Sequence, residues 1–175
     1  MLSVGIVYYN EIEQMKICLQ SIFSGTNPRY ITQVILVVNG TLTKDLQNVV
    51  GNYQSIFTGI VFKIITSKRN HIGEGRRRLV QNCKNKYLCI TDPDCRVSPH
   101  WAEDYLAEHD RIYRLDQAVA SLCGPVKIVS NIDLFKFLQK NKIKTFSPQV
   151  DIAERFSRID HSQTSNAFYV VDKVR

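Results

Sequence analysis

The sequence has no apolar run long enough to cross a membrane. Its longest apolar runs, residues 34–38 and 59–62, are much shorter than the ~20 residues that a membrane-spanning helix needs. The first residues also lack the basic cluster that begins a secretion signal. These absences predict a soluble, cytoplasmic protein whose contact with a membrane, if any, is peripheral.

Cysteine, glycine and proline are too few or too scattered for several protein classes. The 5 cysteines are an odd number with no Cys-x-x-Cys pair, which argues against a disulfide framework or a zinc site. The 8 glycines and 5 prolines exclude a collagen-like or low-complexity chain. With 44% hydrophobic residues among 175, we expect one globular domain in which most cysteines are core residues.

Positive charge is in excess. Lysine and arginine number 23 against 16 aspartates and glutamates, and 23 − 16 gives the net charge of +7. This favours an anionic partner: a nucleotide, a phosphorylated substrate, nucleic acid or a membrane surface. The basic residues are scattered without a recognition motif, so specific nucleic-acid binding is not expected. A lysine-rich tract in residues 131–160 fits either a solvated helix face or a flap near an anionic ligand.

Apolar periodicity predicts alternating strands and helices. Strand-like runs at residues 3–8, 34–38, 60–66 and 87–91 are separated by stretches with helical spacing, and residues 118–123 add a further strand. Strands joined in this way form parallel sheets with right-handed crossovers. The predicted fold class is therefore α/β, a mostly parallel central sheet with helices on both faces.

Local signals predict where helices begin and which side chains they bury. Asn10 followed by Glu13 is a capping-box pattern at the start of the first helix. Another helix should begin after Gly73 and Gly75. The helix over residues 99–113 should turn three side chains inward: Trp101, Tyr105 and Ile112.

Two carboxylates follow the fourth predicted strand, in Asp92-Pro93-Asp94. Ligands of parallel sheets bind beyond the carboxyl ends of the strands, which is where these acids are expected. They can hold Mg²⁺ or Mn²⁺, with the remaining ligands supplied by phosphate oxygens and water. Asp and Pro are also common in ordinary turns, so this motif alone leaves both interpretations open.

Several segments together resemble the family-two glycosyltransferases of the GT-A fold. The resemblance rests on the strand that runs into Tyr9-Asn10, on Cys18-Leu19-Gln20-Ser21-Ile22 and on Val37-Val38-Asn39-Gly40. It continues in the Gly-Glu-Gly-Arg-Arg-Arg start of a helix at residues 73–78. The Asp-x-Asp strand at residues 87–95, with Pro99 and Trp101 behind it, completes the match.

The resemblance implies an organisation and an activity. A single GT-A-like domain would span residues 1–175, with the donor-binding part in 1–125 and an incomplete acceptor-side part, truncated at its C-terminus, in 126–175. Ser165-Asn166-Ala167-Phe168 is similar to the segment that precedes the acceptor side. The implied reaction is metal-dependent, inverting transfer of a sugar from a nucleotide diphosphate sugar to an acceptor hydroxyl of a saccharide, a lipid-linked molecule or a protein.

The resemblance also implies roles for individual residues. The nucleoside pocket would be lined by Val7, Tyr8, Tyr9 and Asn10, Asn39 would face the base, and Arg78 would lie near the phosphates. Asp92 would contact the ribose or the metal, and Asp94 would coordinate the divalent cation, Mn²⁺ or Mg²⁺.

Elementary geometry limits these roles. Side chains alternate along a strand, so only one of Tyr8 and Tyr9 can point away from the core. Successive helical residues point in different directions, so the arginines of residues 76–78 cannot all face one ligand. Asn39 before Gly40 is also a common turn pair.

Two departures from the family pattern leave alternatives open. The family commonly has an aspartate at the position of Asn39, whose neutral amide changes how a base can be bound. No general base is identified, because the downstream carboxylates lie outside the expected motif. The alternative function is a non-catalytic nucleotide-sugar-binding domain or a truncated fragment lacking the base. The four carboxylates in question are Asp151, Glu154, Asp160 and Asp172.

Two other classes fit poorly. In phosphatases with an aspartate nucleophile, the Asp-x-Asp motif follows the first strand, whereas here it follows the fourth. A dinucleotide-binding domain needs Gly-x-Gly-x-x-Gly after its first strand, where this chain has Tyr8-Tyr9-Asn10.

Overall fold

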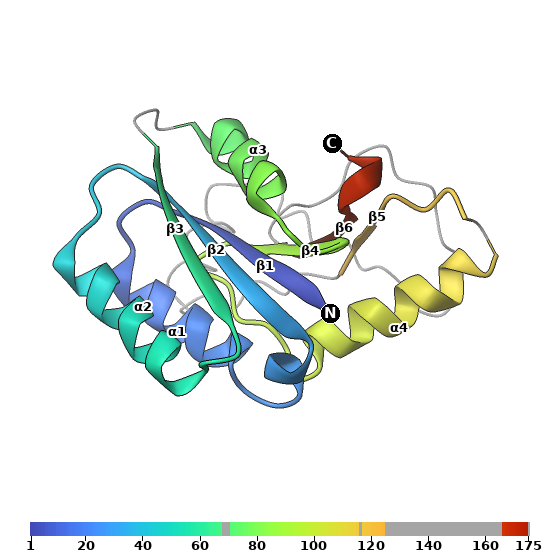
Figure 1. Ribbon diagram of the computed structural model, residues 1–175, viewed down its shortest axis with the longest axis horizontal. Helices are drawn as coiled ribbons and strands as arrows, with labels where there is room; N and C mark the ends of the chain where they lie inside the picture. The colour runs from blue at the N-terminus through green and yellow to red at the C-terminus, as the bar shows by residue number, and fades with distance from the viewer. Residues whose placement is uncertain (68–70, 116, 125–165, 175) are drawn as a thin grey trace, which may run out of the picture.

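The computed structural model describes residues 1–67, 71–115, 117–124 and 166–174, which form a sheet flanked by helices (Figure 1). The strands are β1 (Leu2–Tyr8), β2 (Ile31–Asn39), β3 (Val61–Ser67), β4 (Tyr87–Thr91), β5 (Ser121–Cys123) and β6 (Asn166–Val170). The helices are α1 (Ile12–Ile22), α2 (Lys44–Ile56), α3 (Ile72–Asn82) and α4 (Trp101–Tyr113), with short 3₁₀ turns η1 (Asn27–Arg29) and η2 (Val171–Lys173).

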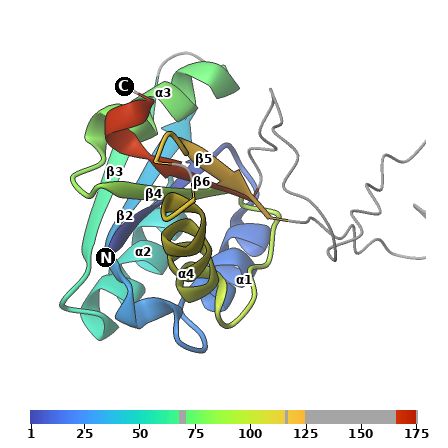
Figure 2. The same cartoon turned by 90° about the vertical axis from the view of Figure 1, so that its right-hand side faces the viewer.

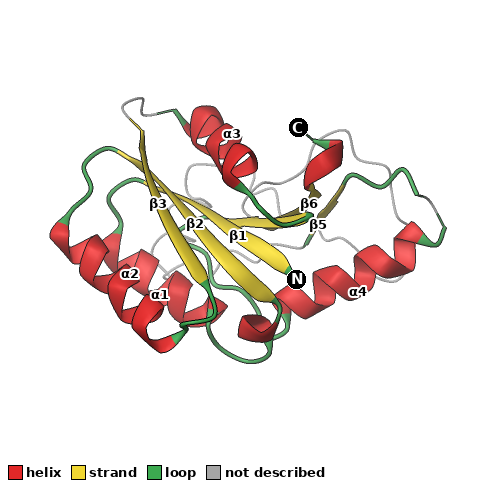
Figure 3. Cartoon of the chain, viewed as in Figure 1, coloured by secondary structure: helices red, strands yellow, loops and turns green. Residues whose placement is uncertain are grey.

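The six strands lie in the order β3-β2-β1-β4-β6-β5, and the strands are labelled in Figure 1 and coloured yellow in Figure 3. The first four in this order are parallel, and β6 pairs antiparallel with both β4 and β5. The mostly parallel α/β sheet predicted from the sequence is therefore confirmed, and β6 is an antiparallel strand that was not predicted.

The chain changes direction across the sheet at β1. It first passes from β1 to β2 and β3, and α3 then returns it to β4 on the other side of β1. Because right-handed crossovers in opposite directions put their helices on opposite faces, α1 and α2 cover one face and α3 covers the other (Figures 1 and 2). Such a reversal point is where parallel sheets bind ligands, at the carboxyl ends of β1 and β4.

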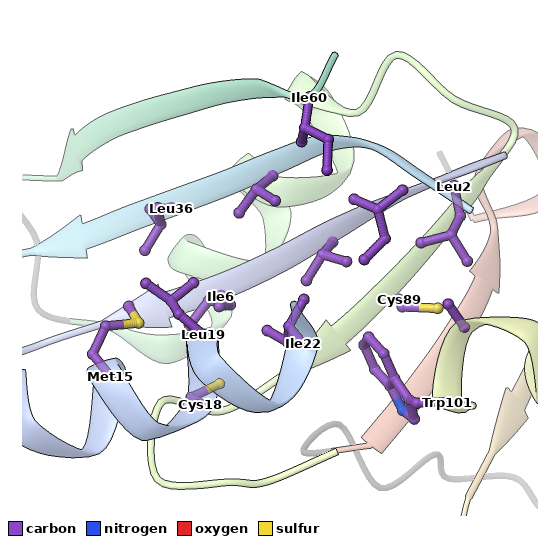
Figure 4. Packing of buried hydrophobic residues seen from close by; sticks show 14 of the residues in the cluster. Leu2, Ile6, Met15, Cys18, Leu19, Ile22, Leu36, Ile60, Cys89 and Trp101 are labelled. Atoms are coloured by element: carbon purple, nitrogen blue, oxygen red, sulfur yellow. The ribbon is translucent and has the colours of Figure 1, made fainter. Parts of the chain in front are cut away.

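The larger core lies under α1, α2 and α4. The α1 side chains face β1 and β2, as Figure 4 shows, and Trp101 of α4 packs in the same cluster. Removing such side chains from water contributes roughly 1.5–3 kcal/mol each. The buried α1 residues recur every three to four positions, the spacing of one helix face: Met15, Cys18, Leu19 and Ile22.

The smaller core lies under α3, which packs very closely on β1. A Cβ atom built on Gly5 would lie 2.9 Å from Cδ1 of Leu79, and one built on Gly75 would lie 2.7 Å from Cγ1 of Val7. A glycine on the strand and another on the helix therefore permit the approach. Leu79 itself is fully buried.

The predicted capping box of α1 does not form. The N-cap is Glu11, and no side chain of the described residues caps the helix. Because the helix begins one residue later than predicted, Glu13 occupies the second helical position instead of the third, where a capping box requires it. The backbone N–H of Asn10 donates instead to Oε2 of Glu11 at 3.0 Å.

Two further expectations need correction. Gly73 and Gly75 lie inside α3 rather than before it, because the helix begins at Ile72 and uses Gly75 for its contact with β1. In α4, Ile112 is only half-buried, whereas His109 is 2% exposed. The buried stripe follows a four-residue spacing from Trp101 through Tyr105 to His109.

Cys18, Cys83 and Cys89 are buried, as expected of core residues, and Cys95 and Cys123 are half-buried. The lysine-rich tract and three of the candidate carboxylates, Asp151, Glu154 and Asp160, lie outside the described residues. In the described parts of the chain, no helix is both long and apolar enough to span a membrane.

Candidate functional site

The parallel strands bring most predicted site residues to one edge of the sheet. Tyr8 lies opposite Val38 in the register of β1 and β2, and Ile6 lies opposite Thr91 in that of β1 and β4. The residues at the ends of these strands therefore emerge next to one another. This edge is the candidate functional site, with Val7 to Asn10, Asn39, Asp92 and Asp94 around it.

The two tyrosines that end β1 have different surroundings. Tyr8 is 1% exposed and packs in the larger core, and burial raises the pKa of its hydroxyl. Tyr9 is 53% exposed and lies beside Gly40, whose built Cβ would be 3.9 Å from Cε2 of the ring. The side chain of Tyr9 is thus accessible to a ligand, as is that of the exposed Asn10, whereas Tyr8 can offer only its backbone.

Asn39 lies beneath the amino-terminal part of α3. Its side chain faces Gly75, where a built Cβ would be 3.5 Å from the Nδ2 atom of Asn39 and would overlap Val7. The Oδ1 atom of Asn39 is buried, and no described residue hydrogen-bonds to it. An unpaired buried acceptor costs about 1–3 kcal/mol, so Asn39 carries unused hydrogen-bonding capacity at this edge.

Asp92 faces α3 and forms an ion pair with it. Its Oδ1 atom is 3.7 Å from Nη2 of Arg76, too long for a direct hydrogen bond. Burial raises the pKa of Asp92, the Arg76 guanidinium partly offsets this, and the charge of Asp94 adds to it. The Nε atom of Arg76 is buried with no hydrogen-bond partner in the described part of the chain, so its guanidinium retains N–H groups that could bind a phosphate.

Asp94 sits in a tight turn after β4. The backbone N–H of Cys95 donates to the carbonyl oxygen of Asp92 at 3.0 Å, and the Cys95 thiol is 3.7 Å from Oδ1 of Asp94. The described residues contain no cluster of three or more metal-binding side chains. Two carboxylates nevertheless fit a hard cation such as Mn²⁺ or Mg²⁺, which takes its other ligands from phosphates and water.

Arg78, the arginine predicted to lie near the phosphates, is bound to α3 and β3. Its Nε donates to Oε1 of Glu74 at 2.9 Å, and Nη1 donates to the carbonyl oxygen of Thr66 at 3.4 Å. Arg77 also binds Glu74 through two hydrogen bonds of 2.8 Å. These bonds, first from Arg77 and then from Arg78, lower the pKa of Glu74 to about 2.

Arg76 is the site residue that the sequence analysis missed. Helix geometry shows only that the three arginines of residues 76–78 cannot all face one ligand, and the resemblance to the family points to Arg78 as the one near the phosphates. The helical spacing contained a usable signal, because Arg76 lies three residues before the buried Leu79 and thus on the same face of α3.

Asp172, the one candidate base among the described residues, lies away from the site. It belongs to η2, directly after β6. Since β6 is antiparallel to β4, Val170 pairs with Tyr87 and the Val171 N–H donates to the Lys86 carbonyl oxygen at 2.8 Å. Asp172 therefore lies toward the sheet edge opposite to Asp92.

Comparison with protein families gives one match. The model described as "Glycosyl transferase family 2" matches residues 3–158. A search of curated proteins found no match.

Solved structures show the same fold at low sequence identity. S. aureus TarS 1-349 is 17% identical and superimposes with a TM-score of 0.71, covering 97% of this chain. The same protein in complex with UDP-GlcNAc is 18% identical, with a TM-score of 0.69 over 97% of this chain and 45% of the other. The mannosyltransferase PcManGT from Pyrobaculum calidifontis, in complex with GDP-Man and Mn²⁺, is 17% identical with a TM-score of 0.56, covering 71% of this chain and 35% of the other. This chain spans 46% of the length of the first structure, less than half.

Proposed function

The chain belongs to glycosyl transferase family 2, and from this premise we propose that it binds a nucleotide diphosphate sugar and transfers the sugar to an acceptor hydroxyl. One observation carries the proposal: Asp92 and Asp94 follow β4 at the sheet edge, with Arg76 on the facing helix 3.7 Å from Asp92. Carboxylates for a cation and a guanidinium for phosphate are the groups that a departing diphosphate requires.

The nucleoside is proposed to lie against the ends of β1 and β2. Tyr9 and Asn10 offer exposed side chains there, while Val7 and Tyr8 contribute backbone. The Asn39 amide has both a donor and an acceptor, so it suits the edges of uracil and guanine alike. The UDP-GlcNAc complex of TarS and the GDP-Man complex of the mannosyltransferase support a nucleotide sugar as the donor.

Asp94 and Asp92 are the residues proposed to hold a divalent cation. When bound, such a cation neutralises the charge that grows on the leaving diphosphate. The Mn²⁺ in the mannosyltransferase structure supports this assignment. Arg76 approaches the diphosphate from α3, and Arg78 can join it if its bond to Glu74 opens.

The proposed transfer is an in-line displacement. The bond from the anomeric carbon to the diphosphate oxygen breaks as the acceptor oxygen attacks from the opposite side, which inverts the anomeric centre. We place the donor-binding part within residues 1–125 and the acceptor side within 126–175. The acceptor proton needs a base, and Asp172 is remote from Asp92 in the sheet.

A thermal-shift measurement tests the site. UDP or GDP with Mn²⁺, at about 100 times the dissociation constant, should stabilise the wild-type chain by ~2.7 kcal/mol. For a chain of this size that corresponds to a rise in Tm of about 5–10 °C. The Asp94→Ala variant should lose the shift, because one of only two carboxylate ligands is removed.

Asp104→Ala is the matched control. Asp104 is an exposed aspartate on α4, so its removal should leave the ligand-induced shift unchanged. An undiminished shift in Asp94→Ala would reject the proposed cation site.

The position of Asp172 favours a second candidate, nucleotide-sugar binding without transfer. Among the described residues that follow β5, Asp172 is the sole carboxylate, and it lies toward the opposite sheet edge. Donor binding without hydrolysis or transfer, across a panel of acceptors, would favour this candidate. Product formation by the chain itself would exclude it.

A further inference from the structure

The loop that carries the two acids is held along its length by side chains from the other face of the sheet. We call residues 92–100 the acid loop. It runs beside α1 and η1 on its way from β4 to α4 (Figure 2). Four residues of that region contact it, and we call them the brace: Cys18, Ser21, Thr26 and Asn27.

The brace residues bind backbone atoms of the acid loop. Residues of α1 bind the first part of the loop, and residues of and beside η1 bind its last part. The Cys18 thiol donates to the carbonyl oxygen of Asp92 at 3.5 Å, and the Val97 N–H donates to Oγ of Ser21 at 3.1 Å. Ser21 and Cys18 belong to the Cys-Leu-Gln-Ser-Ile segment, for which the proposed reaction has no use. The side chains of Cys18 and Ser21 thus have a structural partner in the acid loop.

Asn27 closes the far end of the acid loop. Its side chain is fully buried, with Nδ2 donating to the Ser98 carbonyl oxygen and Oδ1 accepting from the Ala102 N–H, both at 2.8 Å. The backbone N–H of Thr26 donates to the Pro99 carbonyl oxygen at 2.9 Å. The loop end is therefore fixed to η1 and to the first turn of α4 at once.

Gly25 shows how tightly the brace fits. It has a φ of +59°, a left-handed conformation that favours glycine, and a Cβ built on it would lie 2.2 Å from the Pro99 carbonyl oxygen. No side chain could be placed between the brace and the acid loop at this point.

These bonds reach backbone atoms of the acid loop and of the first turn of α4, and they leave the loop's carboxylates untouched. Asp92 points to Arg76 on the opposite side, and Asp94 is exposed. A loop that is fixed before binding loses little conformational entropy when it takes a ligand, so its affinity is higher than that of a free loop.

We propose that the brace preorganises the acid loop for the cation and the diphosphate, and that Ser21 and Asn27 are positioning residues for cation binding. The inference rests on the proposed function, because it concerns the same cation site. It assigns to α1 and η1 a role in ligand affinity that is separate from their part in the core.

The test compares two serines at the end of α1. Ser21→Ala removes the acceptor of the Val97 N–H, whereas Ser24→Ala removes a hydroxyl that donates only to the Ser21 carbonyl oxygen, at 2.8 Å. Mn²⁺ dissociation constants in the presence of UDP or GDP are measured by calorimetry, well below the Tm of each folded variant. Loss of one hydrogen bond should weaken Mn²⁺ binding up to about tenfold in Ser21→Ala.

A second measurement follows the loop without ligand. Hydrogen exchange of the Val97 amide should quicken in Ser21→Ala and stay unchanged in Ser24→Ala. Ser21→Thr keeps the acceptor oxygen and should restore both the exchange rate and the Mn²⁺ affinity. Asn27→Asp replaces the amide group that donates to the Ser98 carbonyl oxygen with an acceptor, and should reduce Mn²⁺ affinity more than Ser21→Ala does. The Ser21 variants are the decisive ones, because Ser21 is only half-buried and its variants should fold.

The outcomes separate the two proposals. A Ser21→Ala variant that binds Mn²⁺ as tightly as the wild type would overturn the brace and leave the proposed function standing. If the wild-type chain does not bind Mn²⁺ in the presence of UDP or in the presence of GDP, the proposed function is overturned, and the role of the brace with it. No substitution is needed for this outcome.

Discussion

The two faces of the sheet end differently at the candidate site. Under α1, α2 and α4, apolar packing continues to the last residue of β1, where Tyr8 is still part of the core. Under α3, the same level of the sheet carries Asn39, Arg76 and Asp92, and one polar atom each of Asn39 and Arg76 is buried with no partner among the described residues. On the larger-core face, the buried polar atom at this level without such a partner is the hydroxyl of Thr91. The α3 face therefore holds more of the free hydrogen-bonding capacity at this edge, and it also carries the charged groups.

This difference arises from the two-residue period of strands combined with the close approach of α3. Residues with alternate numbers on β1 and β2 face alternate cores, so Tyr8 and Asn39 point to opposite faces. The glycines at 5 and 75 then let α3 come near enough to cover Asn39 and bring Arg76 to Asp92. Polar groups are thereby gathered on the face with the smaller core.

The largest expected effect on stability comes from truncating one buried leucine on each face of the sheet. Leu36→Ala in the larger core and Leu79→Ala in the smaller one should each lower the free energy of unfolding by about 2–5 kcal/mol, because both side chains are fully buried. Only Leu79→Ala should also weaken binding of UDP or GDP with Mn²⁺, since α3 carries the arginines. Urea denaturation and calorimetry on the folded proteins measure the two effects, and equal losses of affinity would break the comparison.

A smaller effect is expected from two glycines inside helices. Gly75→Ala should lower the free energy of unfolding by about 1–3 kcal/mol, because its new Cβ would lie 2.7 Å from Val7 and force α3 outward. In Gly51→Ala, on α2, the new Cβ would have no atom within 4 Å, so this substitution should raise the free energy of unfolding by ~0.5–1 kcal/mol. Thermal melts measure both, and a stabilising Gly75→Ala would mean that α3 is not held against β1 by close contact.

The sequence predicted the parallel part of this architecture because its signals are local. The strand at residues 87–91 was predicted with the bounds of β4, and the buried face of α1 follows from the spacing of its apolar residues. The Asp-x-Asp turn could be placed at the carboxyl edge for the same reason. The order of strands and the antiparallel partner β6 depend on pairing across the chain, which no local pattern encodes.

Other parts of the site depend on contacts between distant residues. Whether Arg76 or Arg78 faces Asp92 is decided by how α3 lies on β1, which two glycines control from separate elements. The bonds from Ser21 and Asn27 to the acid loop span more than 70 positions of the chain. Asn39 illustrates what a local pattern cannot predict, since the first residue of a common turn pair is buried.

The smallest expected effect distinguishes two acids that pair with arginines of α3, Asp92 and Glu74, through their opposite responses to pH. Burial raises the pKa of Asp92 in the folded state, so the unfolded chain releases this proton more easily. Stability should therefore fall as pH rises from about 4, the unfolded value, through the raised folded value, and stay lower above it. Asp92→Asn should then be more stable than the wild type at pH 7, with the advantage gone near pH 3, while the Mn²⁺-dependent shift is lost.

Glu74 of α3 is the matched control, and its effect on stability is expected to have the opposite sign. Arg77 and Arg78 lower its pKa to about 2, so its contribution to stability is present above about pH 4.3 and is lost as pH falls toward 2. Glu74→Gln should be less stable than the wild type at pH 7, and the difference should vanish at low pH. If Asp92→Asn, like Glu74→Gln, were less stable than the wild type at pH 7, the charge of Asp92 would stabilise the folded state. Its assignment to a ligand site would then be rejected.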